Sequence, residues 1–398
     1  MSSKPAPDEP TALPAALFAL GFRPFFLAAG VAAIILVATW VAALRGVALP
    51  TVYDPVGGPM AWHGHEMLFG YVSAVIAGFL LTSVRNWTGQ PTPTGPRLVG
   101  LAALWLAGRV APFLPASIPP AWAAGMDLAF LPALTLALAI PLLRQGAARN
   151  LVFVPILLAL TAANVMFHLQ VLGIAATGRT GQLLAVDLIV LVITIIGGRV
   201  LPFFIDRALP EAHPVTRPGL DALCVAAVVA LAVLRLLGAD DALRVVAGLA
   251  AALHAARLAG WHDARLWSKP LLWVLYLGYA WLVVGFAMTA LSGVMPRFTS
   301  LALHAFTAGA MGSMTLGMMT RVSLGHTGRP LVASGAALFS FVAILAAGLI
   351  RVLIPAVAPS LYNDLIAVAG LLWIAAFLPF VAAFGPILIR PRPDGRAG

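Results

Sequence analysis

The chain carries very little charge for its length. Only 10% of its 398 residues are Asp, Glu, Lys or Arg, whereas 61% are hydrophobic. Its mean hydropathy is +0.99. A soluble domain has no use for that much apolar surface, so the composition predicts an all-α protein that crosses a membrane many times. The formal net charge of +10 does not indicate a nucleic-acid partner, because the basic residues are spread through short loops.

Cysteine and the common catalytic motifs are also scarce. The single cysteine, Cys224, excludes an internal disulfide and a multi-cysteine iron–sulfur cluster. The chain has no Walker loop, Gly-x-Gly-x-x-Gly, His-Glu-x-x-His or Gly-x-Ser-x-Gly. ATP hydrolysis, dinucleotide binding by a Rossmann domain and standard serine or zinc hydrolysis therefore have no support. We expect no cleavable signal peptide, because Met1–Pro14 is polar and rich in proline.

Apolar runs separated by Pro, Gly and charged residues predict a bundle of twelve transmembrane helices. The expected spans are 15–44, 64–84, 98–114, 121–144, 150–173, 182–205, 219–238, 241–260, 270–292, 300–321, 331–355 and 362–388. They form one transmembrane domain, 15–388, between a short N-terminal tail, 1–14, and a short C-terminal tail, 389–398.

Basic residues are unequally divided between the two sides of this bundle. With twelve spans both termini share one side, and that side holds 17 of the 24 Lys and Arg residues. Because Lys and Arg collect in cytoplasmic loops, we predict that both tails are cytoplasmic.

The most informative stretch is Trp62–Met67, where a polar loop is expected to become an apolar helix. It contains His63, His65 and Glu66, and ionisable residues inside a membrane are by default functional. Two neighbouring imidazoles indicate metal or haem ligands, although water, headgroups or carbonyls could equally satisfy interfacial histidines. Side chains two apart on a straight helix diverge by about 200°. Either Gly64 allows a non-helical entry that brings the two imidazoles together, or each serves a different centre, or only one of them is a ligand.

Two more histidines fall in the same outer layer of the predicted bundle. His168 lies just before the outer end of the fifth span, and His304 lies in the first turn of the tenth. Ligand sets in helical bundles are assembled in this way, so the layer predicts a cofactor site. Asn164, one turn before His168, could orient its imidazole. Glu66 could hold an imidazole tautomer, accept a proton, or only complement the start of a helix.

Several charged residues have two possible roles. Asp127 and Asp187 could pair with Arg109 or Arg179, or belong to a proton path. At the cytoplasmic helix ends, a second group could bind haem propionates or lipid headgroups, or simply anchor the helices at the interface. Its members are Arg199, Arg321 and Arg329, with His326 as a possible ligand nearby.

An ordered series of motifs runs along nearly the whole chain. It comprises Gly21–Phe26, Trp62–Tyr71, Ala77–Thr82, Asn86–Gly89, Gly197–Arg199, Leu271–Leu275, and Met314–Leu316 through Leu324–Arg329. In this combination the chain resembles the NnrS family of bacterial membrane proteins linked to nitric oxide.

The resemblance implies a protein of the bacterial inner membrane that contains haem, expected to be b-type, and copper. It also implies a role in nitric oxide response and tolerance of nitrosative stress in denitrifying or nitric oxide-exposed bacteria. On the matching positions, the ligand candidates are His63, His65, His168 and His304, with His254 and His326 as weaker ones.

Three functions are consistent with these residues. The leading hypothesis is a haem- and copper-binding protein that takes nitric oxide or metal–nitrosyl species as ligand, surrounded by membrane lipids. The second is an oxidoreductase resembling haem–copper oxidases that turns over nitric oxide with quinol as electron donor. The third is a transporter of copper, haem or another small solute, which helices interrupted by Gly and Pro would favour.

Overall fold

The computed structural model describes residues 16–49, 51–53, 57–115 and 117–396. Over these residues the chain is helical and forms no β-strand, which confirms an all-α polytopic membrane protein. The predicted tail 1–14 lies outside the described residues, as do the last two residues of the predicted tail 389–398.

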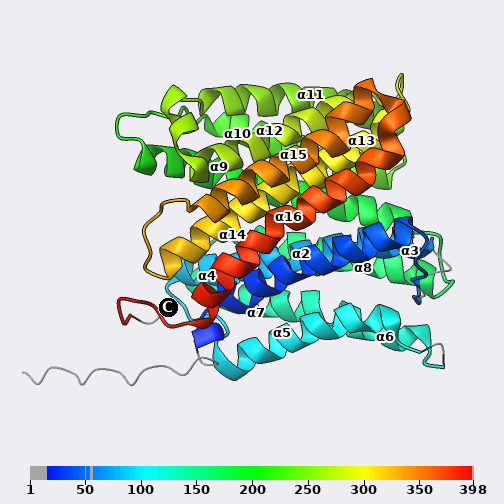
Figure 1. Ribbon diagram of the computed structural model, residues 1–398, viewed down its shortest axis with the longest axis horizontal. Helices are drawn as coiled ribbons and strands as arrows, with labels where there is room; N and C mark the ends of the chain where they lie inside the picture. The colour runs from blue at the N-terminus through cyan, green and yellow to red at the C-terminus, as the bar shows by residue number, and fades with distance from the viewer. Residues whose placement is uncertain (1–15, 50, 54–56, 116, 397–398) are drawn as a thin grey trace, which may run out of the picture.

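The helices run roughly alongside one another (Figure 1). Their bounds are α2 Phe22–Leu44, α3 Gly58–His65, η2 Glu66–Val72, α4 Ser73–Thr88, α5 Gly95–Val110, η3 Ala111–Phe113, α6 Pro120–Leu128, α7 Phe130–Gln145, α8 Phe153–Val171, α9 Gly178–Ala208, α10 Pro218–Leu236, α11 Asp240–Gly260, η4 Ala264–Ser268, α12 Pro270–Leu291, α13 Phe298–His304, η5 Ala305–Met311, α14 Gly312–His326, α15 Gly335–Val357, η6 Pro359–Leu361 and α16 Tyr362–Ile389.

Within the described residues, ten helical segments are long and apolar enough to cross a membrane. Two further helical segments occupy the places of the third and tenth expected spans. One is the short α5 with η3, which carries Arg109, and the other is the run α13–η5–α14. The total of twelve spans and the cytoplasmic position of the termini stay predictions.

The beginning of α2 and the end of α16 lie at the same end of the bundle (Figure 1). The buried Arg23 in the first turn of α2 joins them. One of its terminal nitrogens donates to the carbonyl of Leu388 at 2.9 Å and to that of Arg390 at 2.8 Å. An even number of crossings between these two helix ends would place them together in this way.

Two of the spans, α3–η2–α4 and α13–η5–α14, contain a π-helical stretch. Each stretch directly follows one of the histidines that the sequence analysis named as a ligand candidate. η2 begins after His65 and η5 begins after His304. The wider π-helical turn is rare and is found frequently at functional sites, because it re-aims the side chains around it.

The second span begins earlier than the sequence predicted. α3 starts at Gly58 rather than at residue 64, because Pro59 is well suited to the first turn of a helix. His63 and His65 therefore both lie within a helix, and the non-helical entry considered at Gly64 is wrong. Gly64 instead allows α9 to approach: a Cβ there would lie 3.0 Å from the side-chain nitrogen of Gln182, which donates to the carbonyl of Ala61.

Candidate metal centre

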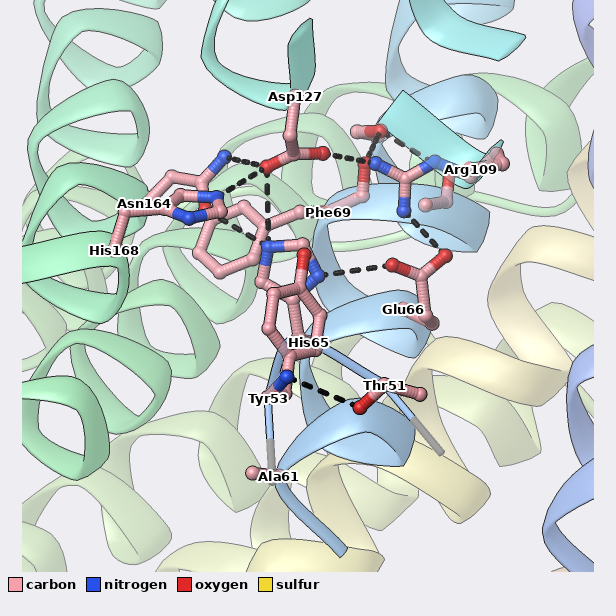
Figure 2. Close-up of polar contacts among 12 residues, drawn as sticks. Thr51, Tyr53, Ala61, His65, Glu66, Phe69, Arg109, Asp127, Asn164 and His168 are labelled. Carbon is pink, nitrogen blue, oxygen red and sulfur yellow. Dashed lines mark hydrogen bonds and ion pairs between the residues drawn. The ribbon is translucent and has the colours of Figure 1, made fainter. Parts of the chain in front are cut away.

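Five segments bring polar side chains into one cluster inside the bundle (Figure 2). Its members are His65 at the end of α3, Glu66 in η2, Arg109 on α5, Asp127 on α6, and Asn164 and His168 on α8. We call these six residues the His65 cluster. The side chain of Arg109 is 11% exposed, and each of the other five residues is at most 2% exposed.

Both ring nitrogens of His65 face acceptors. Nδ1 lies 3.0 Å from Oε1 of Glu66, and Nε2 lies 3.1 Å from Oδ2 of Asp127 and 3.0 Å from Oδ1 of Asn164. Because these partners are oxygens, a hydrogen on either ring nitrogen has an acceptor, and an imidazolium would use both sets of acceptors. One metal ion could take the place of the proton on Nε2.

Asp127 has more hydrogen-bond partners than any other member of the cluster. Its Oδ2 accepts from the Asn164 amide at 2.7 Å and from Nε2 of His168 at 3.0 Å, besides the bond from His65. Its Oδ1 accepts from Arg109. A Cβ on Gly108 would lie 2.8 Å from this Oδ1, so the glycine leaves room for the carboxylate between α5 and α6.

Arg109 balances the charge of the cluster. It donates to Oε2 of Glu66 at 2.6 Å and also to Asp127, bridging the two carboxylates. With His65 as an imidazolium, the two carboxylates, the guanidinium and this ring sum to zero. This balance explains how four charges are tolerated within a membrane-spanning bundle, where an unpaired charge would be strongly destabilising.

The geometry suits a metal ion held by His65, Asp127 and His168. Each offers one ligand atom, and the three atoms lie within 4.8 Å of one another. The two imidazole-to-carboxylate separations, 3.1 and 3.0 Å, are close to the edge of about 3.3 Å expected of a tetrahedral site with bonds of about 2.0 Å. Two imidazoles and a carboxylate suit copper, zinc or iron(II). Glu66 on the other nitrogen of His65 would fix the ring, as carboxylates behind ligating histidines do.

Aromatic rings close the cluster on the side of His65. The ring centroids of Tyr53, Phe69 and Phe167 lie 5.0, 5.1 and 4.5 Å from that of the imidazole. The hydroxyl of Tyr53 is buried without a hydrogen-bond partner in the described structure. Exclusion of water by these rings strengthens every electrostatic interaction inside the cluster.

The other two outer histidines form a second group, which we call the His63 cluster: His63, His304 and Arg351. Among these three, the direct contact is between Arg351 and His304. Nδ1 of His304 donates to the Ser300 carbonyl at 2.8 Å, which leaves Nε2 to accept from Arg351 at 3.0 Å. His63 stacks on Trp40 with centroids 4.7 Å apart.

The four expected ligands therefore divide into two pairs. His65 lies with His168, and His63 lies with His304. The side chains of His63 and His65 point to different places because residues two apart on a continuous helix diverge. That they serve different centres stays a prediction. Nδ1 of His63 and Nδ1 of His168 are buried and have no hydrogen-bond partner within the described part of the chain.

The cytoplasmic-end candidates make local contacts. Arg199 donates to the side chain of Asn150 at 2.8 Å, and Arg329 donates to the Thr327 carbonyl at 3.2 Å. His326 packs on the ring of Phe22, with centroids 5.7 Å apart. Partial burial, with the nearby charge of Arg390, lowers the pKa of Arg329. A role for Arg199, Arg329 or His326 in cofactor binding stays a prediction.

The acidic residues are only partly as expected. The pairing of Asp127 with Arg109 is confirmed. The expectation that Asp187 pairs with Arg109 or Arg179 is wrong, because it accepts from Arg235 on the adjacent helix α10 at 2.5 Å. Sequence spacing could not distinguish these partners, since all are arginines at similar predicted depth.

Two members of the site carried weaker signals. Asn164 was a possible partner for orienting His168, but it bonds to Asp127 and His65 instead, because the Asp127 carboxylate lies against both α8 and the end of α3. Tyr53 lies in the connection before α3, and nothing in its sequence surroundings marked it.

A protein-family model described as NnrS protein matches residues 16–392. A comparison with curated proteins finds no match. The matched range contains both histidine clusters and nearly the whole bundle.

Proposed function

This chain belongs to the NnrS family, and from that premise we propose that it binds copper and b-type haem in the inner membrane of a bacterium. Family membership suggests a role in the nitric oxide response. The His65 cluster, in which two buried imidazoles and a carboxylate converge on one point, carries the proposal.

We assign copper to His65, Asp127 and His168. The donor set suits borderline transition metals, and the ion would replace the Nε2 proton of His65 without disturbing the bond from Nδ1 to Glu66. A monovalent ion keeps the cluster neutral, and a divalent ion leaves one positive charge. Copper can adopt both states, whereas zinc offers only the divalent one.

We assign haem to the His63 cluster. His63 and His304 come from different spans, and Nδ1 of His63 is a buried ligand atom with no partner in the described residues. Nε2 of His304 would become a second ligand atom once Arg351 donates to a propionate instead of to this ring. Arg351, at 3.0 Å from His304, has the fork geometry that binds a propionate. Haem, when bound, would supply an iron to which nitric oxide or another diatomic gas can bind. At the cytoplasmic end, Arg199, Arg329 and His326 would contact lipid headgroups or the propionates of a second haem, because the helix from His304 to His326 rises about 33 Å.

A second candidate function is a nitric oxide oxidoreductase that takes electrons from quinol. The chain of hydrogen bonds from Glu66 through His65 to Asp127 favours it, because linked donors and acceptors can move a proton. Consumption of nitric oxide by purified protein with a quinol would support this function. Binding of nitric oxide without turnover would leave the binding function, and uptake of copper into vesicles would favour the transporter.

The two cofactor assignments are tested by a double dissociation. Copper and haem are measured in full-length protein purified from cells supplied with both. We expect His65→Ala and His168→Ala to lose copper and keep haem, and His63→Ala and His304→Ala to lose haem and keep copper. Loss of both cofactors in all four folded variants would contradict two separate centres. Iron or zinc in place of copper would contradict the metal assigned.

A further inference from the structure

A small apolar cavity of about 70 Å³ lies where α2, η2–α4, α9 and α14 meet. We propose that it binds one molecule of a small neutral gas of diatomic size. The inference rests on the proposed function only for the identity of that gas as nitric oxide, since the cavity itself involves neither metal cluster.

The lining offers no free polar group. It consists of Phe26, Val72, Val75, Ile76, Phe79, Leu80, Ile189, Val192, Ile193, Ile196, Gly197, Met314, Thr315 and Met318. Thr315 carries the only side-chain hydroxyl among them, and that hydroxyl bonds to the Met311 carbonyl at 2.6 Å and to the Tyr71 hydroxyl at 2.5 Å. A buried water needs two to four polar partners, so a cavity lined in this way stays dry.

The volume of the cavity limits the size of the molecule that it can bind. Its 70 Å³ is several times the ~10–15 Å³ that one water requires and about half the ~150 Å³ of a cavity that takes benzene or xenon. A diatomic gas or a xenon atom fits this volume. Met314 and Met318 line it, and methionine side chains are polarisable, which strengthens dispersion contacts with such a guest.

The position of the cavity relates it to both histidine clusters. Val72 is the last residue of η2, and Met314 follows η5 within a turn. Seven residues of helix separate Val72 from His65, which corresponds to a rise of about 10 Å. The hydroxyls of Tyr71 and Thr315 join the two spans beside the cavity. A gas dissolved in the bilayer would therefore have an apolar binding site about two helical turns from the proposed copper.

Xenon is the direct probe, and metal-free protein is the right sample. Crystals of the full-length chain are pressurised with xenon, and its anomalous signal is located. We expect one peak among α4, α9 and α14 in the wild type. Val192→Leu, which adds a methylene to the lining, should lose that peak. Val229→Leu, the same change at a position on α10 that is 44% exposed, should keep it.

Ile193→Ala provides the opposite test should Val192→Leu fail to fold. Removing side-chain volume from the lining should let xenon reach the same occupancy at lower pressure. No peak in the wild type, a peak that survives in folded Val192→Leu, or no gain in Ile193→Ala would overturn the proposal. Because no metal is present, a xenon peak in a protein that proves unable to bind copper would retain the cavity and reject only the proposed function.

Discussion

His65 lies between two carboxylates, with no solvent contact on its side chain. Burying two ions costs several kcal/mol each before their attraction is counted, and apolar residues of similar volume would often be more stabilising. The network is therefore a poor device for stability alone. Its residues converge as ligands do, and this convergence is the reason to regard it as a binding site.

Glu66 should control the affinity for the metal without being a ligand. In Glu66→Gln the Nδ1 proton of His65 loses its charged acceptor, so we expect copper affinity to fall by about 10–100-fold. Titration against a chelator of known affinity measures this. Glu211→Gln makes the same chemical change on an exposed residue and should leave affinity unchanged. Equal affinity in both variants would remove Glu66 from the site.

Arg109 should be required for stability because it compensates two carboxylates. Arg109→Met leaves Glu66 and Asp127 with one countercharge fewer, which should lower the free energy of unfolding by about 3–5 kcal/mol. Unfolding in detergent micelles measures the loss. Adding Glu66→Gln to Arg109→Met should recover part of it, because one unpaired charge is then removed. Strictly additive losses would show that the two side chains do not interact.

At the scale of the helix, hydrophobic runs predicted the positions of the spans but not their internal irregularities. The third expected span, 98–114, corresponds to α5 with η3, although it carries a charge. The sequence of Glu66–Val72 is apolar enough for any helix type, so the π-helical hydrogen bonding of η2 had no visible signal. The early start of α3 could have been inferred from Pro59.

Gly181 should be required for the contact between α8 and α9. A Cβ there would collide with the backbone carbonyl of Ala163 and lie 2.9 Å from the Cβ of Met166. Gly181→Ala should therefore lower the free energy of unfolding by about 1–3 kcal/mol through overpacking. It should also weaken copper binding, because α8 carries His168.

Gly100→Ala is the matched control for this substitution. A Cβ at Gly100 meets nothing within 4 Å, and alanine favours a helix interior by about 0.5–1 kcal/mol over glycine. This variant should be slightly more stable than the wild type. If Gly181→Ala were equally well tolerated, α8 and α9 would have to be separable at little cost.

At the scale of the whole molecule, the sequence predicted which histidines share a depth but not which of them meet. Depth follows from counting spans, whereas pairing depends on how α3, α8 and α13 are arranged around one another. Asp127 was visible as a membrane acid, but its position between three helices became apparent only in the folded bundle. The topology of the termini still depends on the distribution of basic residues.

Topology can be tested with single cysteines in a Cys224→Ala background. Val294, between α12 and α13, is 78% exposed, and Val332, between α14 and α15, is 72% exposed. Because we predict cytoplasmic termini, Val294→Cys should react with a membrane-impermeant thiol reagent in intact spheroplasts. Val332→Cys should react only after the membrane is opened. The reverse pattern would invert the predicted orientation.

The proposed copper site is tested most directly by the copper content of purified Asp127→Asn beside Asp187→Asn. Both substitutions neutralise a buried aspartate that is paired with an arginine, but only Asp127 lies between the two imidazoles. We predict about one copper per chain in the wild type and in Asp187→Asn, and a large loss in Asp127→Asn. Full copper in folded Asp127→Asn, or none in the wild type, would contradict a metal centre at His65, Asp127 and His168.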